Sequence, residues 1–279
     1  MPTDPEALPW TENRPSSTRL PRFDLGELWA YRELGLFFAL RDLKLRYKQT
    51  AFGVGWAILQ PLVGALIFSA LLGRSSRLPS DGIPYPVFVY TGLCVWFYFA
   101  GSLTATSNSL VANSGLVTKI YFPRIIAPLS AVLPSLIDLV VSLAILAAFM
   151  GVYGVAPSAA LAFLPLAVVF VAAVVLAFGL WLAALNVQYR DVRPALGFLI
   201  QIWLFASPVV FASSLVPDEW RYVYALNPMV GVVDTFRWSL VGAPAPGLDV
   251  LVSLAVAALT FVGGLVYFGR LQRRFADVI

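Results

Sequence analysis

Apolar residues lie along the chain in six blocks, separated by short polar segments. A block of about 20 apolar residues is long enough to cross the hydrocarbon core of a bilayer as a helix, because that core is about 30 Å thick. The pattern therefore predicts an all-α integral membrane protein with six transmembrane helices. The predicted spans are 51–73, 87–110, 125–150, 159–185, 195–214 and 248–269.

Residues 25–50, ahead of the first block, follow a helical period instead. At about 100° per residue one face forms an apolar stripe, and Leu34, Phe38 and Leu45 form a second apolar patch opposite it. The stripe consists of Leu25, Trp29, Leu36, Leu40, Leu43 and Tyr47. This pattern predicts an amphipathic helix that lies at the cytoplasmic membrane interface, preceded by a polar tail over residues 1–24.

The stretch between the fifth and sixth blocks, residues 212–247, is too polar to span the membrane and too apolar for a free loop. Asn227 stands directly before Pro228, the order expected for a helix N-cap followed by proline at the first helical position. The stretch is predicted to form two short helices that lie at the outer surface or dip back into the membrane. Residues 51–279 thus make one membrane domain with a short cytoplasmic C-terminus.

Composition agrees with a chain that has the bilayer as its solvent. Hydrophobic residues make up 59% and charged residues 12% of the sequence, against roughly 45–50% and about 25% in soluble domains. The net charge of +4 is not gathered on a basic face of a soluble fold, so nucleic acid is not a predicted partner. Cys94 is the one cysteine and cannot form a disulfide within the chain.

The basic residues predict the topology. An even number of spans places both termini on one side, and cytoplasmic loops carry an excess of Lys and Arg. Of the 19 Lys and Arg residues, only Arg74, Arg77, Arg221 and Arg237 fall on the side opposite the termini. Both termini are therefore expected in the cytoplasm.

The sequence offers few residues suited to catalysis or to metal binding. It has no histidine, which removes the commonest metal ligand and general base, and none of its three lysines follows a glycine as a phosphate-binding loop requires. We predict no catalytic residue, no metal site and no cofactor in the chain, so that ATP and Mg would belong to a partner. Asp138 is the one ionisable residue well inside a predicted span, and we interpret it mainly as the partner of a polar or basic neighbour.

Four segments along the chain form a series of short motifs. The first runs from Arg41 to Thr50 (RDLKLRYKQT) and continues through Gly53, Trp56 and Gln60-Pro61. The others, in order, are Lys119–Arg124 (KIYFPR), Asn186 with Tyr189–Val192 (YRDV), and the terminal Phe275-Ala276-Asp277. In order and spacing these segments resemble the membrane subunits of ABC-2 type polysaccharide exporters, and the resemblance covers the chain from about residue 25 onward.

This resemblance implies a place in a larger assembly. In that family two copies of the membrane subunit join two copies of a separate ATPase and export a lipid-linked glycan across the bacterial cytoplasmic (inner) membrane. The implied cargo is an O-antigen, capsular, teichoic-acid or galactan-like polymer. A separate ATPase agrees with the phosphate-binding loop that this sequence lacks.

Two sets of residues are candidates for substrate binding. Arg41, Lys44 and Lys48 cluster on one flank of the predicted interfacial helix, where they are suited to the diphosphate of a polyprenyl-linked glycan or, equally, to anionic lipid headgroups. Aromatic rings in the spans are suited to stacking on sugars along a conduit, although aromatics at span ends also form membrane belts. The aromatic candidates are Trp56, Tyr90, Trp96, Tyr98, Trp203 and Phe205.

The loop between the second and third predicted spans is a candidate for coupling to the ATPase. Pro123 stops a helix there, and Tyr121 and Phe122 offer an apolar knob that suits a groove on a partner. Given the resemblance, coupling is favoured over a simple interfacial anchor. The residues are Lys119, Ile120, Tyr121, Phe122, Pro123 and Arg124.

Three other functions stay open from the sequence. The first is an ABC-2 exporter of a small lipid or drug, and only the motif at residues 41–61 separates a polysaccharide exporter from it. A membrane-bound glycosyl- or phosphotransferase needs clustered acidic residues in a polar loop, which only Asp218-Glu219 approaches. A passive channel needs no ATPase.

Overall fold

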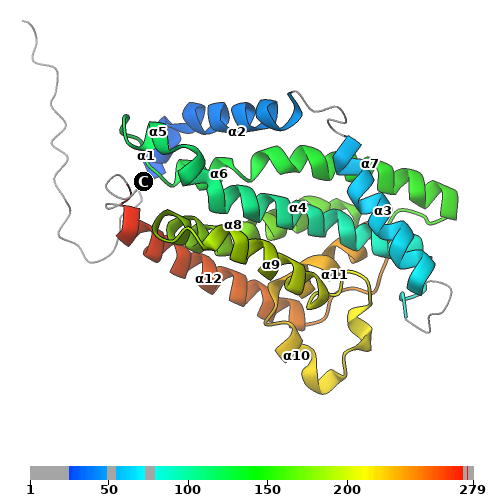
Figure 1. The fold of residues 1–279 in the computed structure, drawn as a ribbon. Helices are drawn as coiled ribbons and strands as arrows, with labels where there is room; N and C mark the ends of the chain where they lie inside the picture. The colour runs from blue at the N-terminus through cyan, green and yellow to red at the C-terminus, as the bar shows by residue number, and fades with distance from the viewer. Residues whose placement is uncertain (1–24, 49–54, 73–78, 273–274, 276–279) are drawn as a thin grey trace, which may run out of the picture.

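The structure is a computed structural model that describes residues 25–48, 55–72, 79–272 and 275. Regular structure in these residues is helical throughout, which confirms the predicted all-α class. Figure 1 shows long helices lying side by side along one axis, with shorter helices around them. The predicted tail 1–24 lies outside the described residues.

Within the residues that the structure describes, four segments are long and apolar enough to cross a membrane. They are α4 (Tyr85–Ala112), α6 with α7 (Ile126–Ser130 and Leu133–Tyr153), the 3-10 helix at Ala159–Phe163 with α8 (Leu164–Gln188), and α12 (Asp249–Leu271). These segments confirm the blocks predicted at 87–110, 125–150, 159–185 and 248–269. The chain is therefore a multi-pass membrane protein.

The first and fifth predicted spans form shorter helices in the described residues. Helix α3 covers Gly55–Leu72, with its apolar part at Ile58–Leu72, and α9 covers Val192–Phe205. Fourteen residues reach only about 21 Å as an α-helix. Helix α9 ends just before Pro208, which disfavours helical geometry at Ser207 and has no N–H to continue the helix.

Helix α4 forms the centre of the bundle, with α3, α7, α8 and α11 packed around it. Its side chains are buried along nearly its whole length. Close approach to α8 depends on Gly179, because a Cβ at this position would lie 2.5 Å from the Thr106 side chain. Small residues allow this kind of tight helix contact in lipid, where no hydrophobic effect drives helices together.

The predicted outer stretch folds into α10 (Arg221–Tyr224) and α11 (Pro228–Val241). Asn227 caps α11 as predicted, because its side chain accepts a hydrogen bond from the Met229 backbone N–H. Eleven residues of α11 are buried, and the helix packs against α4, α8 and α12. It dips into the bundle rather than lying on its surface.

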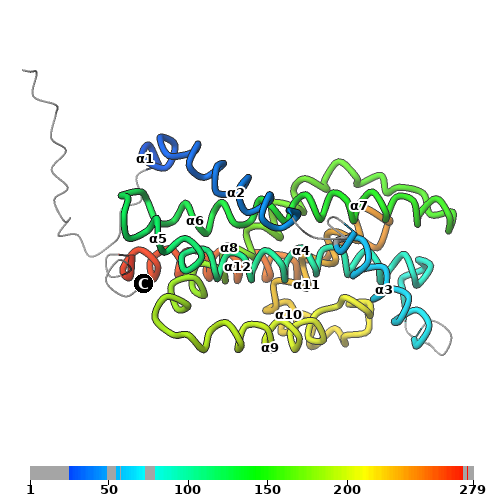
Figure 2. Tube along the Cα trace, turned by 45° about the horizontal axis from the view of Figure 1, so that its top comes forward, coloured from blue at the N-terminus to red at the C-terminus, as the bar shows by residue number. Residues whose placement is uncertain are grey.

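The predicted amphipathic segment forms α1 (Leu25–Ala30) and α2 (Arg32–Tyr47), while residues 49–50 lie outside the described part. Helix α2 extends along the flank of the bundle beside α6 and α7 (Figures 1 and 2). Phe38, from the smaller predicted patch, is fully buried against the bundle. Leu36 and Leu40, from the predicted main stripe, stay exposed in the single chain.

Candidate functional site

A polar cluster joins the end of α2 to α7. Asp138 on α7 accepts a hydrogen bond from Nη1 of Arg46 at 2.5 Å and another from the Tyr47 hydroxyl. Nη1 of Arg46 also donates to the Ser135 hydroxyl at 3.2 Å. Ser135 and Asp138 are three residues apart on α7 and therefore share a face of the helix. The carboxylate that the sequence left without a partner is thus held by two residues of one helix end.

The cluster lies within a candidate membrane span. Asp138 comes 12 residues after Ile126, where the α6–α7 segment begins, which corresponds to roughly 18 Å along a helix. A lone charge at the centre of a spanning helix costs about 2.5–3.5 kcal/mol, and pairing with Arg46 offsets that cost. Intramembrane charges are also the residues most often used in transport pathways.

Tyr47 stays protonated under all ordinary conditions. Burial of the phenol, together with its hydrogen bond to the Asp138 carboxylate, raises the pKa of Tyr47 to about 12. The hydroxyl is therefore a permanent donor to Asp138. With Arg46 on the other oxygen, both oxygens of the carboxylate are occupied by α2.

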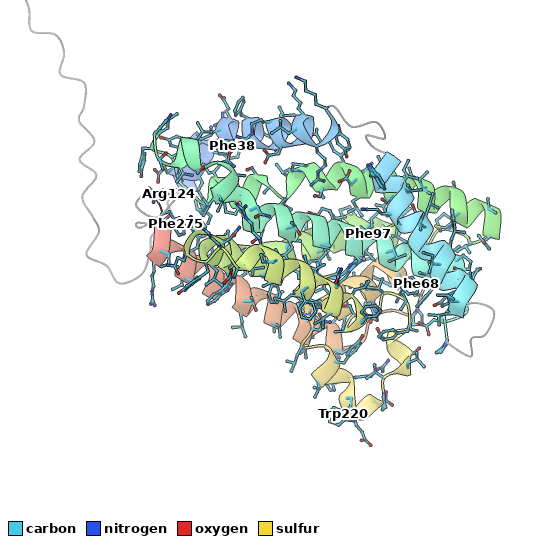
Figure 3. All side chains as sticks on the ribbon, in the orientation of Figure 1. Phe38, Phe68, Phe97, Arg124, Trp220 and Phe275 are labelled. Atoms are coloured by element: carbon cyan, nitrogen blue, oxygen red, sulfur yellow. The ribbon has the colours of Figure 1, made fainter. Side chains whose placement is uncertain are left out.

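A cavity of about 250 Å³ opens beside this cluster, where α3 crosses α4 near the end of α2. Trp56 and Gln60 of α3 line one side, and Tyr98 of α4 lines another. Phe97, which also lines the cavity, marks its position in Figure 3. Aromatic, amide and charged groups therefore converge on one partly open cavity in the membrane domain.

The three predicted basic residues on α2 have different surroundings. Arg41 pairs with Asp42 at 2.6 Å and lies over the ring of Phe38, 5.4 Å from its centroid. Lys44 and Lys48 are exposed, and neither pairs with a carboxylate in the part of the chain that the structure describes. Unlike Arg41, the two lysines have no carboxylate partner among the described residues and are therefore available to an anionic ligand.

The predicted coupling loop follows α5 (Ser114–Val117) and divides into an inner and an outer part. Phe122 is buried and meets Phe38 of α2 edge to face, with ring centroids 5.6 Å apart. Ile120 and Tyr121 are exposed, and the Tyr121 hydroxyl donates to Glu27 of α1 at 3.2 Å. The exposed part of the knob is therefore Ile120 with Tyr121 rather than Tyr121 with Phe122.

The remaining loop candidates surround this contact. Lys119 is exposed, whereas Pro123 and Arg124 are partly covered. In Figure 3 Arg124 and Phe275 lie at the same end of the bundle, with Phe38 nearby. Trp220, directly before α10, lies far from them. The loop, α1 and α2 form one contiguous surface at that end.

The predicted aromatic residues do not share one surface of the single chain. Tyr90, Trp96 and Tyr98 of α4 are buried in its interior. Trp203 lies between Phe99 and Phe178 and donates its indole N–H to Asn227 at 2.8 Å. The most accessible candidates are the rings of Trp56 and Phe205.

One buried polar residue, Arg237, was not among the predicted site residues. Arg237 of α11 is 2% exposed and donates to the carbonyl oxygens of Pro208 and Val209 at 2.6 Å and of Phe211 at 3.3 Å. Its guanidinium lies over the ring of Phe88, 3.5 Å from the centroid. The pattern of charges placed Arg237 on the outer side but gave no indication that it is buried.

Comparison with known proteins gives consistent matches along the chain. A family model described as ABC-2 type transporter matches residues 36–241. An O-antigen export system permease protein RfbA of Klebsiella pneumoniae is 27% identical over 92% of this chain and 98% of its own length. An O-antigen export system permease protein RfbA of Myxococcus xanthus is 30% identical over 85% of this chain and 91% of its own length. A polysialic acid transport protein KpsM of Escherichia coli is 24% identical over 71% of this chain and 77% of its own length.

Proposed function

Because this chain belongs to the ABC-2 type transporter family, we propose that it is the permease of an ATP-driven exporter for a polysaccharide linked to a polyprenyl diphosphate. The chain itself is a non-catalytic transmembrane subunit, and ATP hydrolysis takes place on a separate chain. The resident membrane is the bacterial inner membrane, with both termini in the cytoplasm.

The main support for a polysaccharide cargo is similarity over nearly the whole chain to permeases named for O-antigen export. Three such relatives cover 85–92% of the chain. A more distant pair is named for polysialic acid transport. The shared element in these names is a long glycan, which favours polymer export over a small lipid or drug.

The proposed assembly is a homodimer of this chain with two ATPase subunits. Helices α3 and α9 complete six spans in each copy, with the turn after Phe205 extending the reach of α9. Leu66 of α3 and Phe198 of α9 are exposed apolar side chains in the single chain and suit either lipid or a second copy. The glycan passes between the two copies.

The proposed coupling path starts at the exposed Ile120 and Tyr121, which contact the ATPase. Phe122 passes a displacement of the loop to Phe38, because the two rings are packed together in the cytoplasmic part of the bundle. Helix α2 then carries the displacement to Arg46, whose ion pair with Asp138 holds the far end of that helix on α7. ATP binding at the partner thereby biases two states of the conduit.

The test is to delete the gene and locate the glycan, while purifying the tagged chain from the parent strain. We expect lipid-linked glycan to accumulate on the cytoplasmic side and a nucleotide-binding subunit to copurify. Normal surface glycan in the deletion strain would contradict the proposal. Loss of glycan synthesis would indicate a transferase, and transport without any ATPase would indicate a channel.

A further inference from the structure

Exposed polar side chains are rare inside the apolar helices, and they lie on one group of helices. On α7 and α12 the exposed side chains away from the helix ends are apolar, as at Val140 and Val262. Among the described residues, the exposed polar ones more than a turn from the end of such a helix are Gln60 of α3, Thr104 of α4 and Gln201 of α9. Helices α3 and α9 both pack against α4. Lipid offers no hydrogen bonds to such groups, so this side of the bundle is poorly suited to face lipid.

On α4 the exposed threonine belongs to one continuous face. Gly101, Thr104, Asn108 and Ala112 follow one another at intervals of three and four residues and therefore share a side of the helix, here called the open face of α4. Gly101 lines the cavity beside Asp138, and the face runs from there to the C-terminal end of α4. In Figures 1 and 2 α4 runs between α2 on one side and α9 on the other. Two of the four residues are glycine or alanine, so little side chain fills the space in front of them.

Hydrogen bonds within the protein hold the polar groups of the open face in place. The Thr104 hydroxyl donates to the Ala100 carbonyl oxygen at 2.8 Å, and its oxygen still has lone pairs that can accept. The Asn108 amide donates to the Thr104 carbonyl oxygen at 2.9 Å and accepts from Asn186 of α8 at 3.0 Å. Groups that are already ordered lose little side-chain entropy when they meet a ligand. The face thus offers fixed, weak contacts that suit the hydroxyl groups of a passing polymer.

The burial of α4 indicates what lies in front of this face. Only Thr104 and Ala112 are exposed along the 28 residues of α4, because neighbouring helices cover the rest. Exposed apolar side chains stand on two of those neighbours, Leu66 on α3 and Phe198 on α9. A second copy that packs on α3 and α9 therefore leaves the recessed face uncovered between the copies. We infer that the open face of α4 lines the path of the glycan through the cytoplasmic half of the membrane. The inference rests on the proposed function.

The first test asks whether water reaches the open face. The probe is a methanethiosulfonate that carries a sulfonate group, added to everted inner-membrane vesicles that contain the exporter with Thr104→Cys. The matched control is Val262→Cys on the exposed apolar side of α12, because Val262 lies nine residues from Leu271 and Thr104 eight from Ala112. The reactive thiolate forms in water and is disfavoured in lipid, so we expect Thr104→Cys to react about tenfold faster.

Gly101→Cys is a second labelling position on the same face. A Cβ at Gly101 would lie 3.7 Å from the Ser135 hydroxyl, which is an ordinary contact, so a cysteine fits there without displacing α7. This variant should react as Thr104→Cys does. The wild type measures the background, because its one cysteine, Cys94, is 2% exposed.

The second test asks whether the glycan uses this face. Thr104→Trp places a large ring in the proposed path and should lower surface glycan at least tenfold, while the amount of the chain in the membrane and copurification of the ATPase stay unchanged. Ala112→Trp, nearer the cytoplasmic end of the same face, should act alike. Val262→Trp adds the same bulk on the lipid side of α12 and should export as the wild type does.

The outcomes separate this inference from the proposed function. Equal labelling of Thr104→Cys and Val262→Cys would overturn the open face as an aqueous path. Dimers of Thr104→Cys linked by a disulfide after mild oxidation would also overturn it, because the Cα atoms must then lie within about 7 Å and the second copy covers the face. Normal surface glycan in both tryptophan variants of α4 would mean that the glycan passes elsewhere. The proposed function fails by a different result, normal surface glycan in the deletion strain.

Discussion

Arg237 shows how a single residue stabilises irregular backbone inside a membrane domain. Beyond α9 the chain leaves helical geometry, and carbonyl groups in this turn need donors because lipid supplies none. Arg237 donates three hydrogen bonds to these carbonyls, and its guanidinium also lies over the ring of Phe88. Helix α4 can approach this turn closely only because residue 92 is a glycine. A Cβ at Gly92 would lie 2.5 Å from the Val209 carbonyl oxygen.

Replacing Arg237 should therefore destabilise the protein. Arg237→Lys keeps the charge but loses the planar fork that reaches several carbonyls at once. We expect the free energy of unfolding to fall by about 2–3 kcal/mol, measured by thermal unfolding in detergent. Arg221→Lys is the control, since Arg221 forms an exposed 3.4 Å pair with Asp218 and should change stability by less than about 0.5 kcal/mol. Equal effects of both variants would refute the anchoring role.

The Arg46–Asp138 pair should behave as a unit. Arg46→Gln leaves an uncompensated carboxylate in the bundle, and Asp138→Asn leaves an uncompensated guanidinium, so each single variant should lose stability. The double variant should be more stable than the sum of the two losses indicates, by about 1–3 kcal/mol. Thermal unfolding of all four proteins measures this coupling. Strict additivity would mean that the pair carries no interaction energy.

At the scale of elements, α2 connects the predicted coupling loop to the cavity. One end meets Phe122 through Phe38, and the other holds Asp138 through Arg46 and Tyr47. Only the face that carries Phe38 is buried, so the helix is held on the bundle at a few points. Such an element is suited to move as a rigid body when the loop is displaced.

Substitution of the exposed loop residues should separate folding from coupling. We expect Ile120→Glu with Tyr121→Ala to leave the amount of protein in the membrane unchanged, because both side chains are exposed. Copurification of the ATPase and surface glycan should both fall at least tenfold. Tyr189→Ala is the matched control, an exposed tyrosine in the loop between α8 and α9. Retained copurification in the loop variant would place the ATPase contact elsewhere.

The apolar pattern predicted four spans well because their segments are long and apolar, even where a short break divides α6 from α7. It failed to predict the end of α9, since the residues of block 195–214 stay apolar through the turn at Pro208. Their carbonyls are satisfied by Arg237, which lies 26–29 residues further along the chain. Pairings between residues this far apart in the sequence, including Arg46 with Asp138, depend on the tertiary fold. Periodicity also found both apolar faces of α2 but could not decide which one packs on the bundle.

At the scale of the molecule, the orientation of the chain is directly testable. Cys94 is buried and is the one cysteine, so new cysteines can be probed without removing it. In intact cells whose outer membrane has been made permeable, a maleimide that cannot cross the inner membrane should label Asp218→Cys but not Lys119→Cys. Lysis should expose both positions. Labelling of Lys119→Cys before lysis would reverse the proposed topology.

The opposite charges of Arg46 and Asp138 also determine how the exporter responds to the electrical field across its membrane. Moving one unit charge through that field involves about 2.3 kcal/mol per 100 mV. Because the two charges are 2.5 Å apart, a displacement that keeps them together transfers no net charge of the pair, and the exposed Lys44 and Lys48 lie at the membrane surface in the proposed orientation. The membrane potential therefore does no work on this step. Collapsing the potential with valinomycin and potassium, while ATP is maintained, should leave the rate set by this motion unchanged.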